Sequence, residues 1–300
     1  MGIYIIDYIK KIKTRKSSKV SCTKSGLIPI KALNVLVKFL RFSRLYNSVY
    51  VSVLAISNIL SRKKMIKFYS QFVKNGDLCF DIGANMGNRT EAFLKLGGNV
   101  VVVEPQDVCI QKLSKKYKNN NNVFLVHKAL GAKEGKGKLK ISDSHTVSSM
   151  SDEWIDCVKK SDMFFMSTSA FQWHKTILVP VTTLDSLIEK YGSPAVCKID
   201  VEGFEHQVIK GLSHKIKMLS FEFTPTTKFI NSAIKSIKHL SKIGPVQFNY
   251  SFGESMIFAL PKWVSPEKIC DILLTIPHKT SFSGDIYARF TAFKKSPIVQ

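Results

Sequence analysis

Short apolar stretches alternate with longer amphipathic ones along most of the chain after residue 75. The apolar stretches lack a polar face, which is typical of strands that are covered on both sides. They predict strands over residues 78–82, 100–103, 123–128, 196–201 and 218–223. The amphipathic stretches predict helices over residues 89–96, 108–117, 184–191, 204–211 and 229–243. This order predicts an α/β fold, with a mostly parallel sheet and helices on both of its faces.

The alternation changes near the end of the chain. Apolar segments over residues 246–251, 256–260 and 285–290 follow one another without a helix long enough for a regular crossover at every step. Strands that lack such a crossover pair antiparallel. The sequence therefore predicts an antiparallel hairpin at the edge of the sheet.

Residues 131–182 also break the alternation. Residues 139–142 and 176–181 can pair as short strands around a polar and aromatic segment, residues 145–174. Long irregular segments in compact domains are usually functional. This one would lie over the carboxyl ends of the strands, where open α/β sheets bind ligands. We interpret residues 131–182 as an insert that forms a substrate lid; a surface loop is the alternative.

The domain over residues 75–300 is preceded by a basic, mainly helical extension, residues 1–74. Residues 1–72 hold fifteen Lys and Arg against one acid, Asp7, which gives +14 of the chain's net +23. Such asymmetry favours an anionic partner. A basic helical face within residues 31–45 favours a membrane surface, reached through residues 1–45, over nucleic acid. The alternative is that a lysine-rich composition accounts for the charge.

Cellular location is constrained by what the chain lacks. Its six scattered cysteines form no Cys-x-x-Cys pair, so neither a zinc motif nor a redox motif is predicted. This usage fits a reducing compartment. The N-terminus lacks the apolar core of a signal peptide. We expect a cytoplasmic protein. For the basic helix of the extension two interpretations stay open: peripheral attachment to a membrane, or packing against the catalytic domain.

A glycine turn and an acidic residue define the candidate cofactor site. Gly83 and Gly87 follow the first strand, and Glu104 ends the second, which is the spacing of one βαβ unit. Such glycines let the backbone approach a ligand, and such an acid can accept the ribose hydroxyls of a nucleoside. Asp81 precedes the turn, where it would repel a pyrophosphate but attract an ammonium and a sulfonium. S-adenosylmethionine is therefore favoured over a dinucleotide or a plain core strand.

At these positions the chain resembles the FkbM-type class I methyltransferases. The resemblance covers about residues 70 to 291 and is carried by the glycine turn, Val103-Glu104-Pro105, Thr183-Leu184-Asp185 and Lys198-Ile199-Asp200-Val201-Glu202-Gly203. It implies a Rossmann-like fold and methyl transfer from S-adenosylmethionine to an oxygen, often of a sugar or a secondary metabolite. The residues expected to bind the cofactor are Asp81, Gly83, Ala84, Asn85, Gly87, Thr90, Glu104, Pro105 and Ala129.

Methyl transfer to a hydroxyl requires that the acceptor be held in line and lose a proton. Asp200 ends an apolar strand beside the glycine turn and is the leading candidate for this role. Glu202 and His206 follow it closely and complete the predicted catalytic set. The alternatives are that Asp200 caps the next helix, that Glu202 is structural, and that His206 faces solvent.

The sequence contains two further arrangements of charged residues near Asp200. Asp200, Glu202 and Glu222 could supply oxygen ligands for Mg²⁺, but nothing in their spacing demands it, and no metal is predicted. Lys198 is expected on the opposite face of its strand from Asp200. That placement weakens a Lys-Asp-Lys-Glu set for 2′-O-methylation of RNA.

Three functions stay open on the sequence. The first is an O-methyltransferase that acts on a hydroxyl of a sugar, glycan or small metabolite. The second is a nucleic-acid methyltransferase, of the RNA 2′-O type, that uses the basic arm to hold phosphates. The third is a non-catalytic nucleoside-binding module, which the intact glycine turn, Glu104 and Asp200 disfavour.

Overall fold

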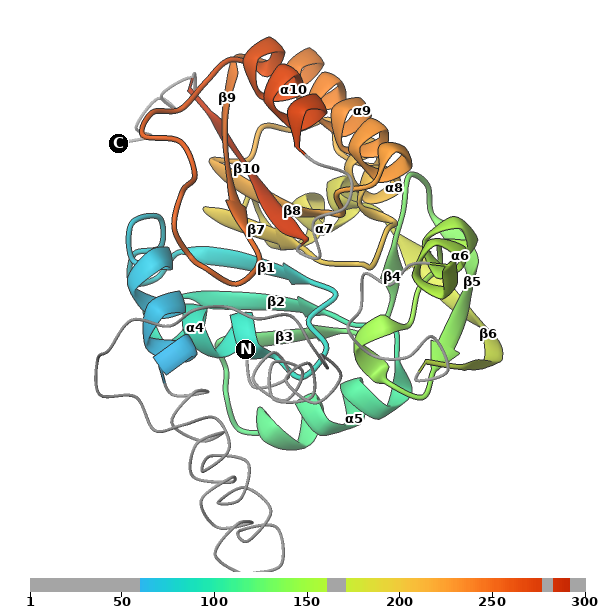
Figure 1. Ribbon diagram of the computed structural model, residues 1–300. Helices are drawn as coiled ribbons and strands as arrows, with labels where there is room; N and C mark the ends of the chain where they lie inside the picture. The colour runs from blue at the N-terminus through green and yellow to red at the C-terminus, as the bar shows by residue number, and fades with distance from the viewer. Residues whose placement is uncertain (1–59, 161–170, 277–282, 292–300) are drawn as a thin grey trace, which may run out of the picture. The chain divides into compact units, whose positions relative to one another are not determined.

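The computed structural model describes residues 60–160, 171–276 and 283–291 (Figure 1). The chain divides into two units, residues 1–64 and 65–300. Residues 1–59, which include the predicted basic helix over 31–45, lie outside the described residues. Within the part that is described, no helix combines the length and apolar character needed to cross a membrane.

The larger unit begins before the predicted boundary after residue 74. Its first element is helical over residues 65–69, and Met65, Phe68 and Tyr69 bury their side chains in the same core as the sheet. Tyr69, for example, packs edge-on against Phe93, with ring centroids 4.8 Å apart. Because their side chains pack in this core, residues 65–74 belong to the compact α/β unit.

A seven-stranded sheet forms the centre of this unit, in the order β3-β2-β1-β7-β8-β10-β9. The strands are β1 (Leu78–Ile82), β2 (Asn99–Val103), β3 (Val123–Val126), β7 (Val196–Ile199), β8 (Met218–Phe223), β9 (Val246–Phe252) and β10 (Gly284–Phe290). The pairs among β3, β2, β1, β7 and β8 are parallel, and β10 is antiparallel to both β8 and β9. The predicted, mostly parallel sheet with antiparallel strands at one edge is confirmed.

Helices cover both faces of the sheet (Figure 1). They are α4 (Asn88–Lys95), α5 (Asp107–Lys116), α7 (Leu184–Tyr191), α8 (Glu205–Lys210), α9 (Thr227–Ile243) and α10 (Pro266–Thr275). Successive strand residues alternate between two cores. Val101 packs in the core with α7 to α10, whereas Val100 and Val102 pack in the core with α4, α5 and the helical residues 65–69.

The antiparallel edge is built differently from a simple hairpin. Residues 256–260 are not a strand, and helix α10 lies between β9 and β10. The side-chain amide of Asn249 donates to the carbonyl of Leu260 and accepts from its amide. These two hydrogen bonds satisfy backbone groups of Leu260 that a neighbouring strand would otherwise pair with. Helix α10 carries its own start signal, because Ser265 caps it and Pro266 occupies its first turn.

The insert contains a second, three-stranded sheet in the order β4-β6-β5. Its strands are β4 (Ala129–Leu130), β5 (Gly135–Ser142) and β6 (Trp173–Thr182). The predicted pairing of residues 139–142 with 176–181 is confirmed, and the two strands run antiparallel. Between them lie the 3₁₀ turn η1 (His145–Val147) and helix α6 (Asp152–Lys160), which the sequence analysis missed. Residues 161–170 of the insert lie outside the described residues.

The glycine turn brings the carboxyl ends of β1 and β7 together. Gly83 has φ of 78°, in the left-handed region that favours glycine. A Cβ atom at this position would overlap the backbone carbonyl oxygen of Asp200. The amide of Asp200 in turn donates to the carbonyl of Ile82 at 2.9 Å. Only glycine allows the two strand ends to approach so closely.

We predict that Gly83→Ala destabilises the fold much more than Gly76→Ala does. Both residues have positive φ, so each substitution costs about 1–2 kcal/mol in backbone strain. Gly76 has open space where its Cβ would lie. At Gly83, overpacking should add about 1–3 kcal/mol or prevent folding. Urea unfolding of the two variants measures the difference, and equal losses of free energy would contradict the close approach.

Candidate active site

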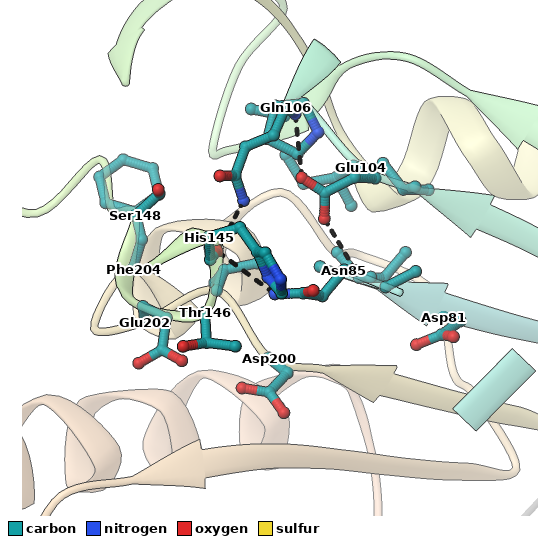
Figure 2. Close-up of a pocket in the computed structure, with 18 of the residues that line it drawn as sticks. Asp81, Asn85, Glu104, Gln106, His145, Thr146, Ser148, Asp200, Glu202 and Phe204 are labelled. Atoms are coloured by element: carbon teal, nitrogen blue, oxygen red, sulfur yellow. Dashed lines mark hydrogen bonds between the residues drawn. The ribbon is translucent and has the colours of Figure 1, made fainter. Parts of the chain in front are cut away.

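A cavity of about 320 Å³ lies at the carboxyl ends of the parallel strands. Its wall combines the turn after β1, the end of β2, the end of β7, the loop after β9 and the segment 145–150 of the insert. Figure 2 shows Glu104 and Gln106 on one side of the view and Asp200 and Glu202 on the other, with His145 between them. Of the predicted site residues, those on this wall are Asp81, Gly83, Ala84, Asn85, Glu104, Pro105, Ala129, Asp200 and Glu202.

Asp81 is buried at the base of the glycine turn. Its Oδ2 atom accepts hydrogen bonds from the amide of Thr90 at 2.8 Å and from the Thr90 hydroxyl at 2.5 Å. Burial raises the pKa of the Asp81 carboxyl. Thr90 and Gly87 do not line the cavity. They shape the turn from behind: Thr90 anchors Asp81, and a side chain at Gly87 would press on Leu113.

Glu104 ties the end of β2 to the glycine turn. Its carboxylate accepts from the amide of Asn85 at 2.8 Å and from the amide of Gln106 at 2.9 Å. Burial raises the pKa of Glu104, although these hydrogen bonds oppose the shift. A buried carboxylate held at the end of β2 is suitably placed to accept ribose hydroxyls. Gln106 and Lys128 also line the cavity but were not among the predicted site residues. Lys128 is the last residue of the predicted strand over 123–128, and Gln106 lies two residues after Glu104.

The insert is bound to the glycine turn through His145. The backbone oxygen of His145 accepts from Asn85 Nδ2 at 3.2 Å and from Gln106 Nε2 at 2.9 Å. Its ring atom Nδ1 is buried and has no hydrogen-bond partner among the described residues. Burial, with help from nearby Lys112, lowers the pKa of His145, which favours a neutral ring. His145 is thus a wall residue that no motif in the sequence had indicated.

The opposite end of the cavity is acidic. Carboxylate oxygens of Asp200, Glu202 and Glu222 lie within 4.8 Å of one another, a spacing that could hold a divalent cation. Burial, followed by the charge of Glu222, raises the pKa of Glu202 well above its ordinary value. Burial, followed by the charge of Asp200, does the same to the pKa of Glu222. This end of the cavity therefore favours retention of protons at neutral pH.

Lys198 lies on the same side of β7 as Asp200, so the expectation that it points the other way is wrong. Its Nζ atom is 3.4 Å from Asp200 Oδ2 and 2.6 Å from Asp285 Oδ1. Residues two apart on a strand share a face, and the turn after Ile199 does not change this. Burial of Lys198 disfavours its charge, but Asp200 and Asp285 outweigh burial and raise the pKa of Lys198.

His206 is not brought to the cavity. It lies on α8, and its Nδ1 atom is 3.2 Å from the hydroxyl of Ser236 on α9. Phe204, two residues earlier, lines the cavity instead. Phe204 is also the N-cap of α8, without a side-chain hydrogen bond, so Asp200 does not have the capping role that was its alternative.

A mostly parallel sheet with a glycine turn after one strand and a buried acid after the next is the framework of a class I methyltransferase. The family model for the methyltransferase FkbM domain matches residues 81–252, more than half of the chain. The chain belongs to this family, whose methyl donor is S-adenosylmethionine. No curated protein matches the chain.

Several solved methyltransferase structures resemble the chain at low identity. A precorrin-6y C5,15-methyltransferase from Geobacter metallireducens GS-15 is 9% identical, with a TM-score of 0.40 over 78% of this chain and 87% of that one. Aeropyrum pernix fibrillarin, in complex with S-adenosyl-L-methionine, is 12% identical, with a TM-score of 0.36 over 72% and 68%. A SAM-dependent O-methyltransferase from Thermotoga maritima is 10% identical, with a TM-score of 0.34 over 77% and 66%. At such identities, none of them bears on the substrate of this chain.

The chemical groups that line the cavity suit S-adenosylmethionine. Glu104 offers a buried carboxylate at the cavity wall, and His145 Nδ1 is a buried polar atom without a hydrogen-bond partner among the described residues. These residues would hold the adenosine part, and Pro105 and Ala129 add apolar surface on the same wall. When bound, the cofactor supplies an electrophilic methyl group on a sulfonium.

Glu104→Ala should weaken binding of S-adenosylhomocysteine by roughly 1–3 kcal/mol, because the hydrogen bonds to the ribose are lost. Isothermal titration calorimetry measures this change. Glu189→Ala is a suitable control, because Glu189 is exposed on α7, away from the cavity. Unchanged affinity of the Glu104 variant would exclude this carboxylate from the cofactor site.

The stability of the protein should depend on pH through Glu205, a buried carboxyl beside the cavity. Burial raises the pKa of Glu205 from 4.5 to about 7. The folded protein therefore keeps this proton over a range in which the unfolded chain has released it. The resulting stabilisation is complete below the unfolded pKa and is lost as the pH rises through the folded pKa.

Glu205→Gln should flatten this decline in the free energy of unfolding between about pH 5 and pH 7. The backbone amides of Val201 and Gly203 donate hydrogen bonds to Glu205 Oε1 at 3.2 and 3.1 Å. Glutamine keeps an oxygen that can accept these two hydrogen bonds. Urea unfolding at several pH values gives the slope for each protein. The exposed Glu189→Gln variant serves as the control, and identical slopes for Glu205→Gln and wild type would refute the assignment.

Proposed function

We propose that the protein transfers a methyl group from S-adenosylmethionine to a hydroxyl of a sugar, glycan or small metabolite. The observation that carries this proposal is the position of Asp200. Its carboxylate lines the cavity, and its backbone packs against Gly83 of the cofactor turn. A proton acceptor beside the donor site is what methylation of a hydroxyl requires.

Asp200 is proposed to receive the proton of the acceptor hydroxyl as the hydroxyl oxygen bonds to the methyl carbon. The methyl–sulfur bond would break in the same step, and its electron pair would remain on sulfur as the neutral thioether of S-adenosylhomocysteine. Lys198, fixed by Asp285 at 2.6 Å, contacts Asp200 Oδ2 and limits its rotation. The side chain of Asp200 is 34% exposed, so the proton can pass from it to water. The chain's contribution is thus alignment of the acceptor and removal of one proton.

The lining beside Asp200 supports a polar acceptor with several hydroxyls. Glu202, Thr146 and Ser148 offer hydrogen-bonding groups on this wall, and Phe204 offers an aromatic ring (Figure 2). Carboxylates and hydroxyls bind the hydroxyls of a sugar, while an aromatic ring packs on its apolar face. This mixture favours a saccharide or a similar polyol over a purely apolar acceptor.

The contact between Lys198 and Asp200 favours a second candidate, 2′-O-methylation of RNA. The placement of Lys198 had argued against that reaction, and the 3.4 Å contact removes the argument. The chain's net charge of +23 also suits an anionic partner. Labelled methyl transfer into a cell extract, with and without ribonuclease treatment, separates the two candidates.

Asp200→Asn should keep cofactor affinity and lose on the order of 10²–10⁴ in turnover, the usual range for a positioned acid–base group. Asparagine preserves the shape of the side chain but removes the base. Transfer of a labelled methyl group to the acceptor fraction of an extract measures turnover.

The matched control for this measurement is Asp271→Asn, an exposed position on α10. Calorimetry with S-adenosylhomocysteine tests that the donor site is intact in both variants. Near-normal turnover of Asp200→Asn would remove Asp200 from the chemistry and shift the assignment to Glu202.

A further inference from the structure

Arg89 lies in the first turn of α4 and lines the same cavity as Glu104. Its side chain is only 11% exposed. Nη2 donates to both carboxylate oxygens of Glu254, at 2.7 and 2.8 Å. Nη1 has a weak acceptor, the thioether sulfur of Met65 at 3.7 Å, and Nε is buried without an acceptor among the described residues.

This pairing leaves much of the hydrogen-bonding capacity of the guanidinium unused. An arginine binds a carboxylate best through two parallel hydrogen bonds from two different nitrogens. Here a single nitrogen contacts both oxygens of Glu254, and a buried N–H donor stays unsatisfied, which is costly. The guanidinium therefore has unused capacity for a carboxylate in a different position.

Glu254 is a counter-ion that can be displaced. Its side chain is 55% exposed, so its charge can return to water at little cost. It belongs to the turn that follows β9, directly after Gly253, whose φ is 49°. The bond to Arg89 joins this turn to α4 across a gap of 165 residues in the chain.

Arg89 and Glu254 line the same cavity as Glu104 and the glycine turn. Strand β9 runs in the same direction as β8, because β10 is antiparallel to both, so Glu254 reaches the cavity from the β9 side of the sheet. Glu104 directly follows β2, which lies on the other side of β1. Arg89 belongs to the helix that follows the glycine turn, so its guanidinium is available to the amino-acid part of a ligand whose adenosine part Glu104 would hold.

We propose that Arg89 binds the α-carboxylate of S-adenosylmethionine, and that Glu254 is a stand-in carboxylate that holds the guanidinium when the cofactor is absent. Arg89 is thus a specificity residue that distinguishes the complete cofactor from adenosine derivatives without a carboxylate. The proposal concerns the cofactor and does not depend on which acceptor is methylated.

Two ligands that differ in the carboxylate test the proposal. S-adenosylhomocysteine carries the amino acid, whereas methylthioadenosine keeps the adenosine and the sulfur but has no carboxylate. In calorimetry, Arg89→Met should weaken S-adenosylhomocysteine by about 10- to 100-fold and change methylthioadenosine by less than about threefold. Lys95→Met, at the exposed last turn of the same helix, should change neither.

Glu254→Gln provides an independent arm, because it changes an exposed residue and leaves the buried arginine in place. Removal of the competing charge should tighten S-adenosylhomocysteine by about three- to tenfold and leave methylthioadenosine unchanged. This arm decides the question if Arg89→Met does not fold, and unchanged affinity for S-adenosylhomocysteine would then overturn the proposal.

Two results of the arginine arm would also overturn the proposal. Equal weakening of both ligands would mean that the ion pair only supports the fold. Unchanged binding of both would mean that Arg89 does not reach the cofactor.

Discussion

The close packing of Gly83 against the backbone of Asp200 is the constraint on which the rest of the site depends. It joins the ends of two adjacent parallel strands, where Ile82 pairs with Ile199. Because the donor turn belongs to one strand and the candidate base to the other, this approach sets the distance between cofactor and acceptor. The bonds from Thr90 to Asp81 and from Asn85 to Glu104 then fix the turn itself. A side chain at residue 83 would disturb all of these contacts together.

A buried cation lies beside the acidic end of the cavity and fixes its geometry. Lys198 is 1% exposed and lies between Asp200 and Asp285, so its charge is compensated on two sides. Such a buried arrangement is weak evidence for stability, since desolvation offsets much of the attraction. Its effect is geometric: Asp285 holds the ammonium, and the ammonium holds Asp200. Beside it, burial raises the pKa of both Glu202 and Glu222, followed by the charge of Glu222 for the first and of Asp200 for the second.

The cavity is closed on two sides by segments that are remote in sequence. On one side, Asn85 and Gln106 bind the backbone of His145 and attach the insert to the cofactor turn. On the other, Arg89 binds Glu254 from the turn after β9. Both contacts involve residues of the cofactor turn, its helix or the adjacent strand end. A cofactor that binds Glu104 and Arg89 therefore affects both walls, and so the space in which the acceptor must lie.

The sequence by itself determined the framework of this protein. Apolar runs with turn residues between them predicted the parallel strands, and β1, β8 and α7 match the predicted ranges in full. The glycine turn, Glu104 and Asp200 were found because motif residues lie at fixed short spacings around strand ends. Only the tertiary structure decided that His145 and Glu254 join the cavity, that Lys198 contacts Asp200, and that His206 turns toward Ser236. Local periodicity records the burial of each segment, whereas contacts across 60 or 165 residues depend on how separate segments pack.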